Sequence, residues 1–425
     1  MSTSTTHEFD AIIVGAGPAG CAAAAILAEH GRKVALLEKT QRRRYSVGES
    51  LIPHCWDALD RLKLVDAVKQ SAFAFPKHAV QFVGTMGNVS KAFYFFQHTD
   101  HPRAHTWQVV REDFDKLLRD NAQCAGAAMF EETRARELVM DDGGRVLGVR
   151  ATTAAGEALE LRAPITIDAT GRDTFAVSRL GWRVPDEKLK KMAIWTYFKG
   201  AKRAEGLDEG TTMVVYLPNK GWFWFIPLPD DIVSVGLVAD KDYLFDDSKD
   251  LGEIFAREVA RQPWMSERLA PGTRIDEFRV TSEFSYRSRH CATDGLVLIG
   301  DAFAFLDPVF SSGVYYALTS GVMVGDAAHA ALAAGDTSAG RFAEYGEAIR
   351  KQIEPMRRLV YAFYDTGFRF GQFLKAYPEQ RSNLTGVLIG DLTKDFDPFF
   401  DEVGRYAYVP PPLPYGMPLE TAPRA

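Results

Sequence analysis

The stretch AIIVGAGPAG, residues 11–20, joins a short apolar run to a turn that contains three glycines. The residues that follow, 21–29, are rich in alanine and have helical character, and a second apolar run covers 33–37. A strand, a tight turn, a helix and a second strand in this order form a βαβ unit. The sequence therefore predicts that an α/β fold begins near its N-terminus.

The glycines of this turn fit the GxGxxG pattern of a dinucleotide-binding site. Gly15 permits the tight turn, Gly17 lets the backbone approach a pyrophosphate, and Gly20 allows the helix to pack closely on the strand. Ala19 lies in the same turn, where the helix N-terminus attracts phosphate charge. Glu38 ends the second strand, where a carboxylate accepts hydrogen bonds from a ribose diol. We predict that these residues bind a dinucleotide.

The composition excludes several classes of function. The chain has 425 residues, of which 46% are hydrophobic and 25% charged, so it is not a disordered protein. A net charge of −6 disfavours bulk binding to nucleic acid or to an anionic membrane. The aromatic fraction of 12%, with 28 Phe, favours a pocket for a flat molecule.

The cysteines and the apolar runs indicate in which compartment of the cell the protein is expected. Cys21, Cys55, Cys124 and Cys291 are far apart, which favours a reducing compartment and predicts neither a disulfide framework nor a metal site. We find no apolar run long enough to span a bilayer, and residues 1–10 lack the order of a signal peptide. We therefore expect a soluble, cytoplasmic protein.

Segments of α/β type surround two aromatic, β-rich stretches, 73–107 and 195–238, which we expect to pair in a separate sheet. Helices are expected over 56–68 and 111–122. The predicted architecture is a Rossmann-like dinucleotide-binding domain with an inserted β-sheet substrate domain and a helical C-terminal segment with a Pro-rich tail. The predicted ranges are 8–72, 106–180 and 285–340 for the first domain, 73–105 and 181–284 for the second, and 341–425 for the C-terminal segment.

Three further segments follow the glycine turn along the chain. They are Arg111-Glu112-Asp113-Phe114-Asp115 with Leu117 and Leu118, then Asp168-Ala169-Thr170-Gly171, and then Gly300-Asp301 with Pro308. Together with the turn they resemble the FAD-binding fold of the hydroxybenzoate-hydroxylase type of flavoprotein. The resemblance implies that Arg111 faces the flavin and that Asp301 contacts the ribityl chain of FAD. It also assigns Glu49, Gly300 and Val314 to FAD binding.

The segment Gly221-Trp222-Phe223-Trp224-Phe225-Ile226-Pro227 is rich in aromatic residues. Because Trp222 and Trp224 are two residues apart, a strand places both rings on one face. The segment resembles the WxWxIP signature of flavin-dependent halogenases. This resemblance implies that the two indoles wall off the flavin, so that it does not act as a monooxygenase. From the residues alone, the alternative is an aromatic strand that packs on a core.

The segment Phe305-Leu306-Asp307-Pro308-Val309-Phe310-Ser311-Ser312-Gly313-Val314 precedes a predicted helix. Ser and Gly at such a position leave backbone N–H groups unpaired, which makes a nest for an anion. The segment is similar to FxDPxxSxG of the same halogenases, which implies that the amides of Ser312 and Gly313 hold a halide. Tryptophan halogenases carry Glu where this chain has Phe310. The resemblance therefore places Phe310 in the substrate pocket and argues against tryptophan as the substrate.

Lys77 lies in Phe75-Pro76-Lys77-His78-Ala79-Val80-Gln81-Phe82, after Gly48-Glu49-Ser50. Most lysines are solvated surface charges. The halogenase order of motifs nevertheless implies that Lys77 is the catalytic residue, which either hydrogen-bonds hypohalous acid or becomes a haloamine. The haloamine route needs a neutral amine, and burial would lower the lysine pKa from its ordinary value of about 10.4. We interpret the adjacent His78 as structural.

The combined resemblance covers about residues 8–370 and implies a flavin-dependent halogenase. Such an enzyme uses FADH2, oxygen and chloride or bromide to halogenate an electron-rich ring, here a phenol or pyrrole, either free or bound to a carrier protein. A single dinucleotide fingerprint implies that a separate flavin reductase supplies the FADH2. The alternatives are a geranylgeranyl-type reductase, an aromatic hydroxylase and a redox-silent flavin-binding scaffold.

Two features leave their roles open. Lys188, Lys190 and Lys191 are the nearest candidate for a basic patch that docks a carrier protein, although such short runs are usually just solvated. Seven phenylalanines in the tail either line a substrate entrance or dock the tail onto the core, and docking is slightly favoured. They are Phe363, Phe368, Phe370, Phe373, Phe396, Phe399 and Phe400.

Overall fold

The computed structural model describes residues 5–40, 47–218, 221–282, 285–365 and 368–419. The N-terminal stretch folds as predicted, because β2 (Ala11–Val14), α1 (Pro18–Glu29) and β3 (Val34–Leu37) form a βαβ unit. Every residue of the two strands is buried. Strands that are covered on both faces are apolar throughout, which is why their sequences do not alternate.

The βαβ unit belongs to a six-stranded sheet with the strand order β21-β22-β12-β2-β3-β8. The strands from β22 to β8 are parallel, and β21 pairs antiparallel with β22. The added strands are β8 (Ala128–Phe130), β12 (Ile165–Asp168), β21 (Ala292–Thr293) and β22 (Leu296–Leu298). Segments far apart in the sequence thus form one sheet, and the α/β fold class is confirmed.

Helix α1 packs on α4 (Arg111–Cys124) and on α9 (Gly313–Ala333). A Cβ atom added to Gly321 of α9 would lie 2.4 Å from the carbonyl oxygen of Ala19. The backbones of α1 and α9 therefore approach more closely than larger residues would permit, which explains the small residues of both helices. The amphipathic helix predicted over 111–122 is confirmed as α4.

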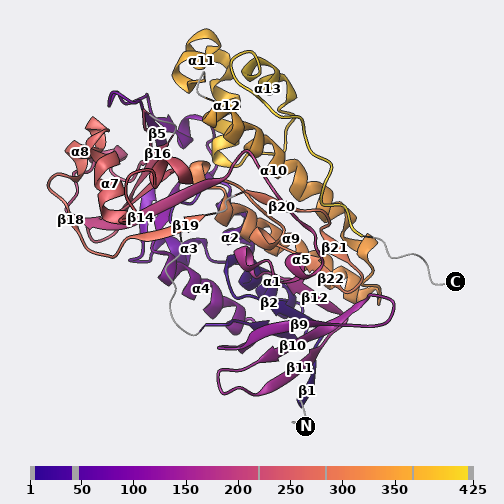
Figure 1. Ribbon diagram of the computed structural model, residues 1–425. Helices are drawn as coiled ribbons and strands as arrows, with labels where there is room; N and C mark the ends of the chain where they lie inside the picture. Colours follow the sequence, from indigo (N-terminus) through magenta and orange to yellow (C-terminus); the bar gives the residue numbers. More distant parts are fainter. Residues whose placement is uncertain (1–4, 41–46, 219–220, 283–284, 366–367, 420–425) are drawn as a thin grey trace.

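A four-stranded sheet with the order β1-β11-β10-β9 lies at the end of the molecule where the N-terminus is marked (Figure 1). Its strands are β1 (Thr5–Glu8), β9 (Arg134–Met140), β10 (Val146–Thr152) and β11 (Ala158–Arg162). A three-stranded sheet consists of β13 (Arg183–Pro185), β20 (Tyr286–Ser288) and β23 (Ala304–Phe305).

The inserted sheet has eight strands in the described part of the chain, with β14 (Lys191–Lys199), β17 (Ile232–Asp240), β16 (Trp222–Leu228) and β15 (Thr212–Tyr216) at its centre. Its outer strands are β5 (Ala79–Val83), β6 (Phe93–Tyr94), β18 (Thr273–Arg274) and β19 (Arg279–Ser282). The predicted pairing of 73–107 with 195–238 is confirmed for β5 and β6. It is wrong for β4 (Ala74–Lys77) and β7 (Thr106–Val109), which form a two-stranded sheet of their own.

The two faces of this sheet pack against different parts of the molecule. Phe223 and Phe225 contact Phe255 of α7 (Leu251–Ala260) and Trp264 of α8 (Pro263–Leu269), with ring centroids 5.6 and 5.3 Å apart. Trp222 and Trp224 point the other way and belong to the large core around the six-stranded sheet. The alternation along β16 therefore divides the aromatic residues between two apolar clusters.

The C-terminal part is helical and lies over the end of the molecule away from the N-terminus (Figure 1). It consists of α10 (Ala343–Tyr364), α11 (Phe370–Ala376), α12 (Arg381–Ile389) and α13 (Asp397–Val403), followed by an extended tail. The seven tail phenylalanines are all buried, which supports docking onto the core. The tail then runs along the α/β part, where the Leu419 amide donates to the carbonyl of Ala292.

Residues 56–68 form two short helices, α2 (Cys55–Arg61) and α3 (Val65–Lys69), where one was expected. Lys63 between them has a φ of +61°, a left-handed conformation that ends a helix. The remaining short helices are α5 (Phe175–Arg179) and α6 (Lys241–Leu244). Cys21, Cys55 and Cys291 are buried, and Cys124 at the end of α4 is exposed. No helix in the described residues is long and apolar enough to cross a membrane.

Candidate active site

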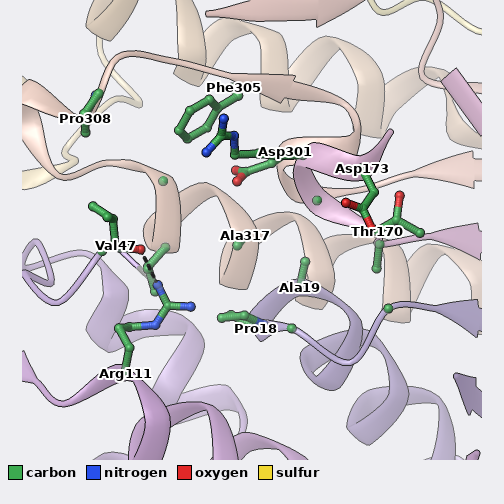
Figure 2. Close-up of a pocket in the computed structure, with 18 of the residues that line it drawn as sticks. Pro18, Ala19, Val47, Arg111, Thr170, Asp173, Asp301, Phe305, Pro308 and Ala317 are labelled. Carbon is green, nitrogen blue, oxygen red and sulfur yellow. Dashed lines mark hydrogen bonds between the residues drawn. The ribbon is translucent and has the colours of Figure 1, made fainter. Parts of the chain in front are cut away.

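A cavity of about 650 Å³ runs from the glycine turn to the inserted sheet. Figure 2 shows Pro18 and Ala19 at the start of α1, with Ala317 of α9 nearby and Arg111 and Asp301 on opposite walls. Ten of the residues predicted for the site line this cavity. They are Gly15, Gly17, Ala19, Glu38, Arg111, Trp222, Trp224, Asp301, Gly313 and Val314.

One end of the cavity is formed by the glycine turn. Gly15 has a φ of +107°, and a Cβ atom there would lie 2.4 Å from the carbonyl oxygen of Ala169. Gly17 is the N-cap of α1, so the first amides of the helix face the cavity without an acceptor in the helix. The carboxylate of Glu38 accepts a hydrogen bond from the Ala16 amide at 3.2 Å. The turn therefore offers amides for a pyrophosphate and a carboxylate beside them.

Arg111 is the first residue of α4 and is buried at the cavity wall. Its Nε and Nη2 donate to both oxygens of Asp115 at 3.0 Å, and its Nη1 donates to the carbonyl of Val47 at 2.8 Å (Figure 2). A Cβ atom on Gly48 would lie 2.7 Å from Nη1, so glycine leaves room for the guanidinium. These bonds fix the planar group in one orientation.

The indoles of Trp222 and Trp224 both line the cavity, with ring centroids 6.0 Å apart. The predicted placement of both rings on one face of a strand is therefore confirmed. Trp224 donates from Nε1 to the hydroxyl of Ser234 at 3.1 Å, and its ring lies over Gly236 of β17, where a Cβ atom would be 2.0 Å away. Gly236 makes room for the indole, and the residues next to Gly236 in the sequence give no sign of this role.

The segment 305–314 turns sharply before α9. Ser311 has a φ of +57°, Ser312 is the N-cap of α9, and Gly313 is its first residue and lines the cavity. The Ser312 side chain makes no capping hydrogen bond, although the residue occupies the N-cap position. Amides at these positions have no acceptor inside the helix. The turn can hold a small anion.

Asp307 belongs to a buried hydrogen-bond chain that the sequence did not indicate. Trp222 donates from Nε1 to the Tyr364 hydroxyl at 2.8 Å, and this hydroxyl donates to Asp307 at 2.7 Å. The other oxygen of Asp307 accepts from the Val309 amide at 3.1 Å. Burial raises the pKa of Asp307 to about 6. Tyr364 lies at the end of α10, so only its position in the folded chain could have identified it.

Lys77 ends β4 and does not line the cavity, from which Ser50 separates it. Its Nζ donates to the Ser50 hydroxyl at 2.8 Å and to the Leu51 carbonyl at 2.9 Å, and it lies 5.5 Å from the centre of the Phe95 ring. The side chain is 3% exposed, and this burial lowers the pKa of Lys77 to about 7. The amine is therefore available in both protonation states near neutral pH.

Phe310 is buried among aromatic rings of the C-terminal part. Its centroid lies 5.7 Å from that of Phe363 and 6.2 Å from that of Phe370, which in turn lies 4.9 Å from Phe82 on the inserted sheet. Phe310 itself does not line the cavity. These aromatic rings connect the turn before α9, the C-terminal part and the inserted sheet.

Four other predicted residues also lie outside the cavity lining. Gly20 and Gly300 allow close packing. A Cβ atom at Gly20 would lie 1.9 Å from the Gly15 carbonyl oxygen, and a Cβ atom at Gly300 would lie 3.0 Å from the Ala19 Cβ. Ser312 is buried just behind Gly313. Glu49 is buried and accepts from the Tyr197 hydroxyl, and burial raises its pKa.

The three lysines of the candidate docking patch are not free surface charges, because each contacts another side chain. Lys190 pairs with Glu187, Lys191 is buried against Asp240 at 2.7 Å, and Lys188 lies 4.4 Å from the Tyr408 ring centre. His78 is partly buried against His105 and away from the cavity lining. Across the described ranges, no cluster of His, Cys, Asp or Glu could hold a metal ion.

Comparisons with known proteins identify the family of the chain. Residues 96–377 match the profile of the tryptophan halogenase family, and residues 10–109 match an FAD-binding domain. A 1H-pyrrole-2-carbonyl-peptidyl-carrier-protein chlorinase from Pseudomonas fluorescens is 28% identical over 91% of this chain and 90% of its own length. A tryptophan 2-halogenase from Chondromyces crocatus is 30% identical over 84% of this chain and 68% of its own length.

Solved structures show the same relationship. The flavin-dependent brominase Bmp2 has a TM-score of 0.85 and 25% identity, and the comparison covers 94% of this chain and 98% of Bmp2. The myxobacterial chondrochloren halogenase CndH has a TM-score of 0.80 and 29% identity, with 94% and 96% covered. These relatives favour a halogenase over a reductase or hydroxylase. The chain belongs to the tryptophan halogenase family and is a flavin-dependent halogenase that uses FAD.

Proposed function

We propose that this halogenase uses FADH2, oxygen and chloride or bromide to halogenate a pyrrole ring that is bound to a carrier protein. The observation that carries the substrate class is the aromatic surrounding of Phe310, where no acidic side chain takes its place. The chlorinase of Pseudomonas fluorescens and a brominase of Pseudoalteromonas luteoviolacea, 29% identical over 78% of this chain, carry names that specify a pyrrole on a carrier protein.

FAD fits the cavity because the chain leaves room at the required points. A Cβ atom at Gly15 or Gly48 would collide with Ala169 or Arg111, so these glycines keep the walls in place. The amides at the start of α1 would hold the pyrophosphate, and Glu38 the ribose. Arg111 and Asp301 would contact the flavin end. When bound and reduced, the cofactor supplies the electrons with which oxygen converts a halide to hypohalous acid.

Three sets of groups then act in sequence, two of side chains and one of backbone amides. Trp222 and Trp224 form part of the cavity wall and there keep water and substrate out of the cavity. The amides of Ser312 and Gly313 bind the halide at the start of α9. Lys77 would hold the hypohalous acid once it has passed the cavity wall that Ser50 helps to form, because Ser50 and Leu51 accept two of the three ammonium hydrogens and leave one for its oxygen.

The substrate ring needs no carboxylate base in this scheme. A pyrrole is electron-rich and can lose its own acidic proton, so it reacts with an electrophilic halogen where a less activated ring needs help. The aromatic group around Phe310 offers a flat, apolar surface for such a ring. A phenol shares this chemistry and is the second ring type to be tested.

The proposal includes two protein partners and a location. A flavin reductase delivers FADH2, since a single dinucleotide turn serves the cavity described above. A carrier protein presents the ring. We place the enzyme in the cytoplasm because its four cysteines form no disulfide.

The test supplies the purified enzyme with FADH2, oxygen and either halide. Pyrrole-2-carbonyl on a carrier protein, free pyrrole-2-carboxylate, a phenol and tryptophan are compared, and mass spectrometry reads the halogen isotope pattern. We expect halogenated product with the carrier-bound pyrrole at a rate at least tenfold above that with the free acid. A preference for tryptophan would contradict the proposed substrate.

The same assay tests the role of Lys77. Lys77→Ala and Lys77→Met should retain FAD and lose at least a thousandfold in halogenation, because hypohalous acid is no longer held near the ring. FAD absorbance and thermal unfolding check that both variants are folded. Halogenation at the parental rate by a folded, FAD-bound variant would remove Lys77 from the mechanism.

A further inference from the structure

Lys77 is connected to the cavity by a hydroxyl group. The Ser50 side chain accepts from Lys77 at 2.8 Å and lies 2.9 Å from the Thr212 hydroxyl. Ser50 and Thr212 line the cavity, and Lys77 does not. All three side chains are buried, so the amine meets the cavity through Ser50.

Gln108 donates a hydrogen bond to Thr212 and so helps to hold its hydroxyl beside Ser50. Its Nε2 donates to the Gly210 carbonyl at 2.9 Å and to the Thr212 hydroxyl at 2.8 Å. A carbonyl can only accept, so the amide nitrogen must face Gly210, and both of its hydrogens are then used. Thr212 accepts from Gln108, which leaves its own hydrogen free to be donated to Ser50 or toward the cavity.

The hydrogen of Ser50 is left with two possible directions. When the amine is neutral, Ser50 can donate its hydrogen to the Lys77 nitrogen while it accepts from Thr212. When Lys77 is an ammonium, Ser50 accepts from it as well, and its hydrogen turns toward the cavity. We propose that Ser50, oriented by Thr212 and Gln108, is a positioning residue that relays protons between Lys77 and the cavity.

The relay step is a balanced proton transfer. A proton leaves the Lys77 ammonium for the Ser50 oxygen, and the original Ser50 proton passes to a water molecule in the cavity. The products are a neutral amine and a hydronium ion, and the reverse sequence charges the amine again. No electrons are exchanged.

This inference rests on the proposed function of Lys77. The oxygen of hypohalous acid takes a proton from the ammonium as the halogen passes to the ring, which yields water and a neutral amine. The ring then loses its proton to solvent, and Ser50 returns one proton to Lys77. Over the cycle, hypohalous acid and the aromatic ring give the halogenated ring and water.

Few titratable groups compete with this relay. Burial lowers the pKa of Lys77 to about 7, and Cys55 of α2 is the group that would oppose that shift if its thiol were ionised. The Cys55 thiol has a pKa raised to about 12 by its own burial, so it stays neutral near pH 7. His78 on the same strand faces His105, and burial lowers its pKa. Glu49 beside Ser50 is engaged by Tyr197.

Substitutions separate the effect of each hydroxyl group from the effect of side-chain shape. Ser50→Ala removes the relay, and Ser50→Thr keeps a hydroxyl. Thr212→Val removes the donor that orients Ser50, and Thr212→Ser restores it. Thr211→Val is the matched control, because Thr211 is a buried neighbour whose hydroxyl has no hydrogen-bond partner in the described residues.

The first readout uses enzyme without FAD and labelled with 15N-lysine. The Lys77 ammonium signal is assigned by its loss in Lys77→Met, and its exchange with water is measured from pH 5 to 8. We expect Ser50→Ala to slow exchange at least tenfold and to lower the Lys77 pKa, since it removes an acceptor from the charged form. Thr212→Val should give a smaller change in the same direction.

The second readout is the pH dependence of halogenation. Ser50→Ala and Thr212→Val should shift the midpoint of the profile, and Ser50→Thr and Thr212→Ser should restore it. Unchanged exchange and an unshifted profile in folded Ser50→Ala would overturn the relay, as would a loss of rate that Ser50→Thr does not rescue. If Lys77→Ala remains fully active, the proposed function of Lys77 fails, whereas the exchange measurement still tests the relay by itself.

Discussion

Lys77 forms no ion pair with any of the residues that the structure describes, although it is buried. A hydroxyl, a carbonyl and an aromatic ring face compensate only partly for the lost hydration of an ammonium. The buried position therefore destabilises the ammonium form of Lys77 relative to the neutral amine. This is the chemical reason why a lysine at this place can exchange protons near neutral pH.

Replacing Lys77 by methionine should change how stability depends on pH. The native pKa is about 7 and the ordinary value is 10.5, so between these values the unfolded chain binds more protons than the folded one. The free energy of unfolding of the parent therefore rises with pH in this window, by about 1.4 kcal/mol per pH unit relative to Lys77→Met. Urea unfolding at pH 7, 8 and 9 measures this, and parallel curves would contradict it.

At the scale of single residues, the sequence predicts those site residues that belong to contiguous motifs. Lys77, Trp222, Trp224 and Gly313 were predicted because they belong to such motifs, and of these Trp222, Trp224 and Gly313 line the cavity. Ser50, Gln108 and Thr212 were not predicted as a group, because they come from the segment before α2, from β7 and from β15, which meet only in the folded chain. Single polar residues in apolar surroundings carry no signal of their partners.

On β16, the position of one indole depends on the strand beside it. Gly236→Ala would place a methyl group inside the Trp224 ring, so either the indole or the strand must shift. We expect a loss of about 1–3 kcal/mol in the free energy of unfolding and a weaker quenching of bound flavin by Trp224. Chemical unfolding and flavin fluorescence are the measurements.

Gly340→Ala is the control for Gly236→Ala, because a Cβ atom at Gly340 would meet no atom within 4 Å. Its stability and flavin fluorescence should match those of the parent within error. A Gly236→Ala variant that also matches the parent in both respects would show that the Trp224 ring is not confined by β17.

Helix α10 contributes to the active site through its last residue. Tyr364→Phe would leave the Trp222 Nε1 and one Asp307 oxygen without the hydroxyl between them, at a cost of about 1–3 kcal/mol. Since that hydroxyl helps to keep the carboxylate charged, its loss should raise the Asp307 pKa further above about 6. The folded protein binds the extra proton, so its stability should fall with rising pH over a wider range above 3.8.

Carbon-13 NMR of labelled aspartate carboxyls measures the Asp307 titration, with Asp307→Asn for assignment. Tyr361→Phe on the same helix is the matched control, because its hydroxyl donates to Asp186 at 2.6 Å and not to Asp307. An unchanged Asp307 pKa in Tyr364→Phe would mean that the hydroxyl does not determine the charge of this carboxylate.

The elements show why a local pattern predicts some boundaries and misses others. Helix α4 follows its apolar spacing from Arg111 onward. The helix expected over 56–68 is divided at Lys63, where the left-handed turn is accompanied by an ion pair of Arg61 with Glu29 at 2.8 Å. Such a turn depends on a distant helix, α1, and the sequence around it gives no sign of this.

At the scale of the whole molecule, the extended tail holds the C-terminal helices against the α/β part. Arg357 donates to the Pro411 carbonyl at 2.6 Å, the Leu413 amide donates to Glu354 at 3.2 Å, and Tyr415 stacks on Phe303 at 5.9 Å. A chain that ends at Tyr408 loses all of these contacts. We expect its free energy of unfolding to fall by about 3–5 kcal/mol, chiefly through loss of the buried Tyr415 ring.

Chemical unfolding with far-UV circular dichroism measures this effect. A chain that ends at Leu419 is the control, because it keeps every contact just named and should be as stable as the parent. Equal stability of the two truncated chains would show that the tail only lies on the surface.

The overall architecture was predictable because GxGxxG, the later flavin motifs and the aromatic stretches occur in a recognisable order. The sheet partners of 73–107 were only half predictable, since β4 and β7 and the strands β5 and β6 have similar composition but different partners. The domain ranges proposed from the sequence stay a prediction.

The distribution of the thiols offers a practical route to the cofactor. Cys124 is exposed at the end of α4, and Cys21, Cys55 and Cys291 are buried. Arg111 begins the same helix at the cavity wall, so at 1.5 Å per residue the two positions are ~20 Å apart. A fluorescent label would attach to the native enzyme at one site, without mutagenesis. Energy transfer from that label to oxidised FAD would then record, in real time, how the cofactor binds to this enzyme and leaves it.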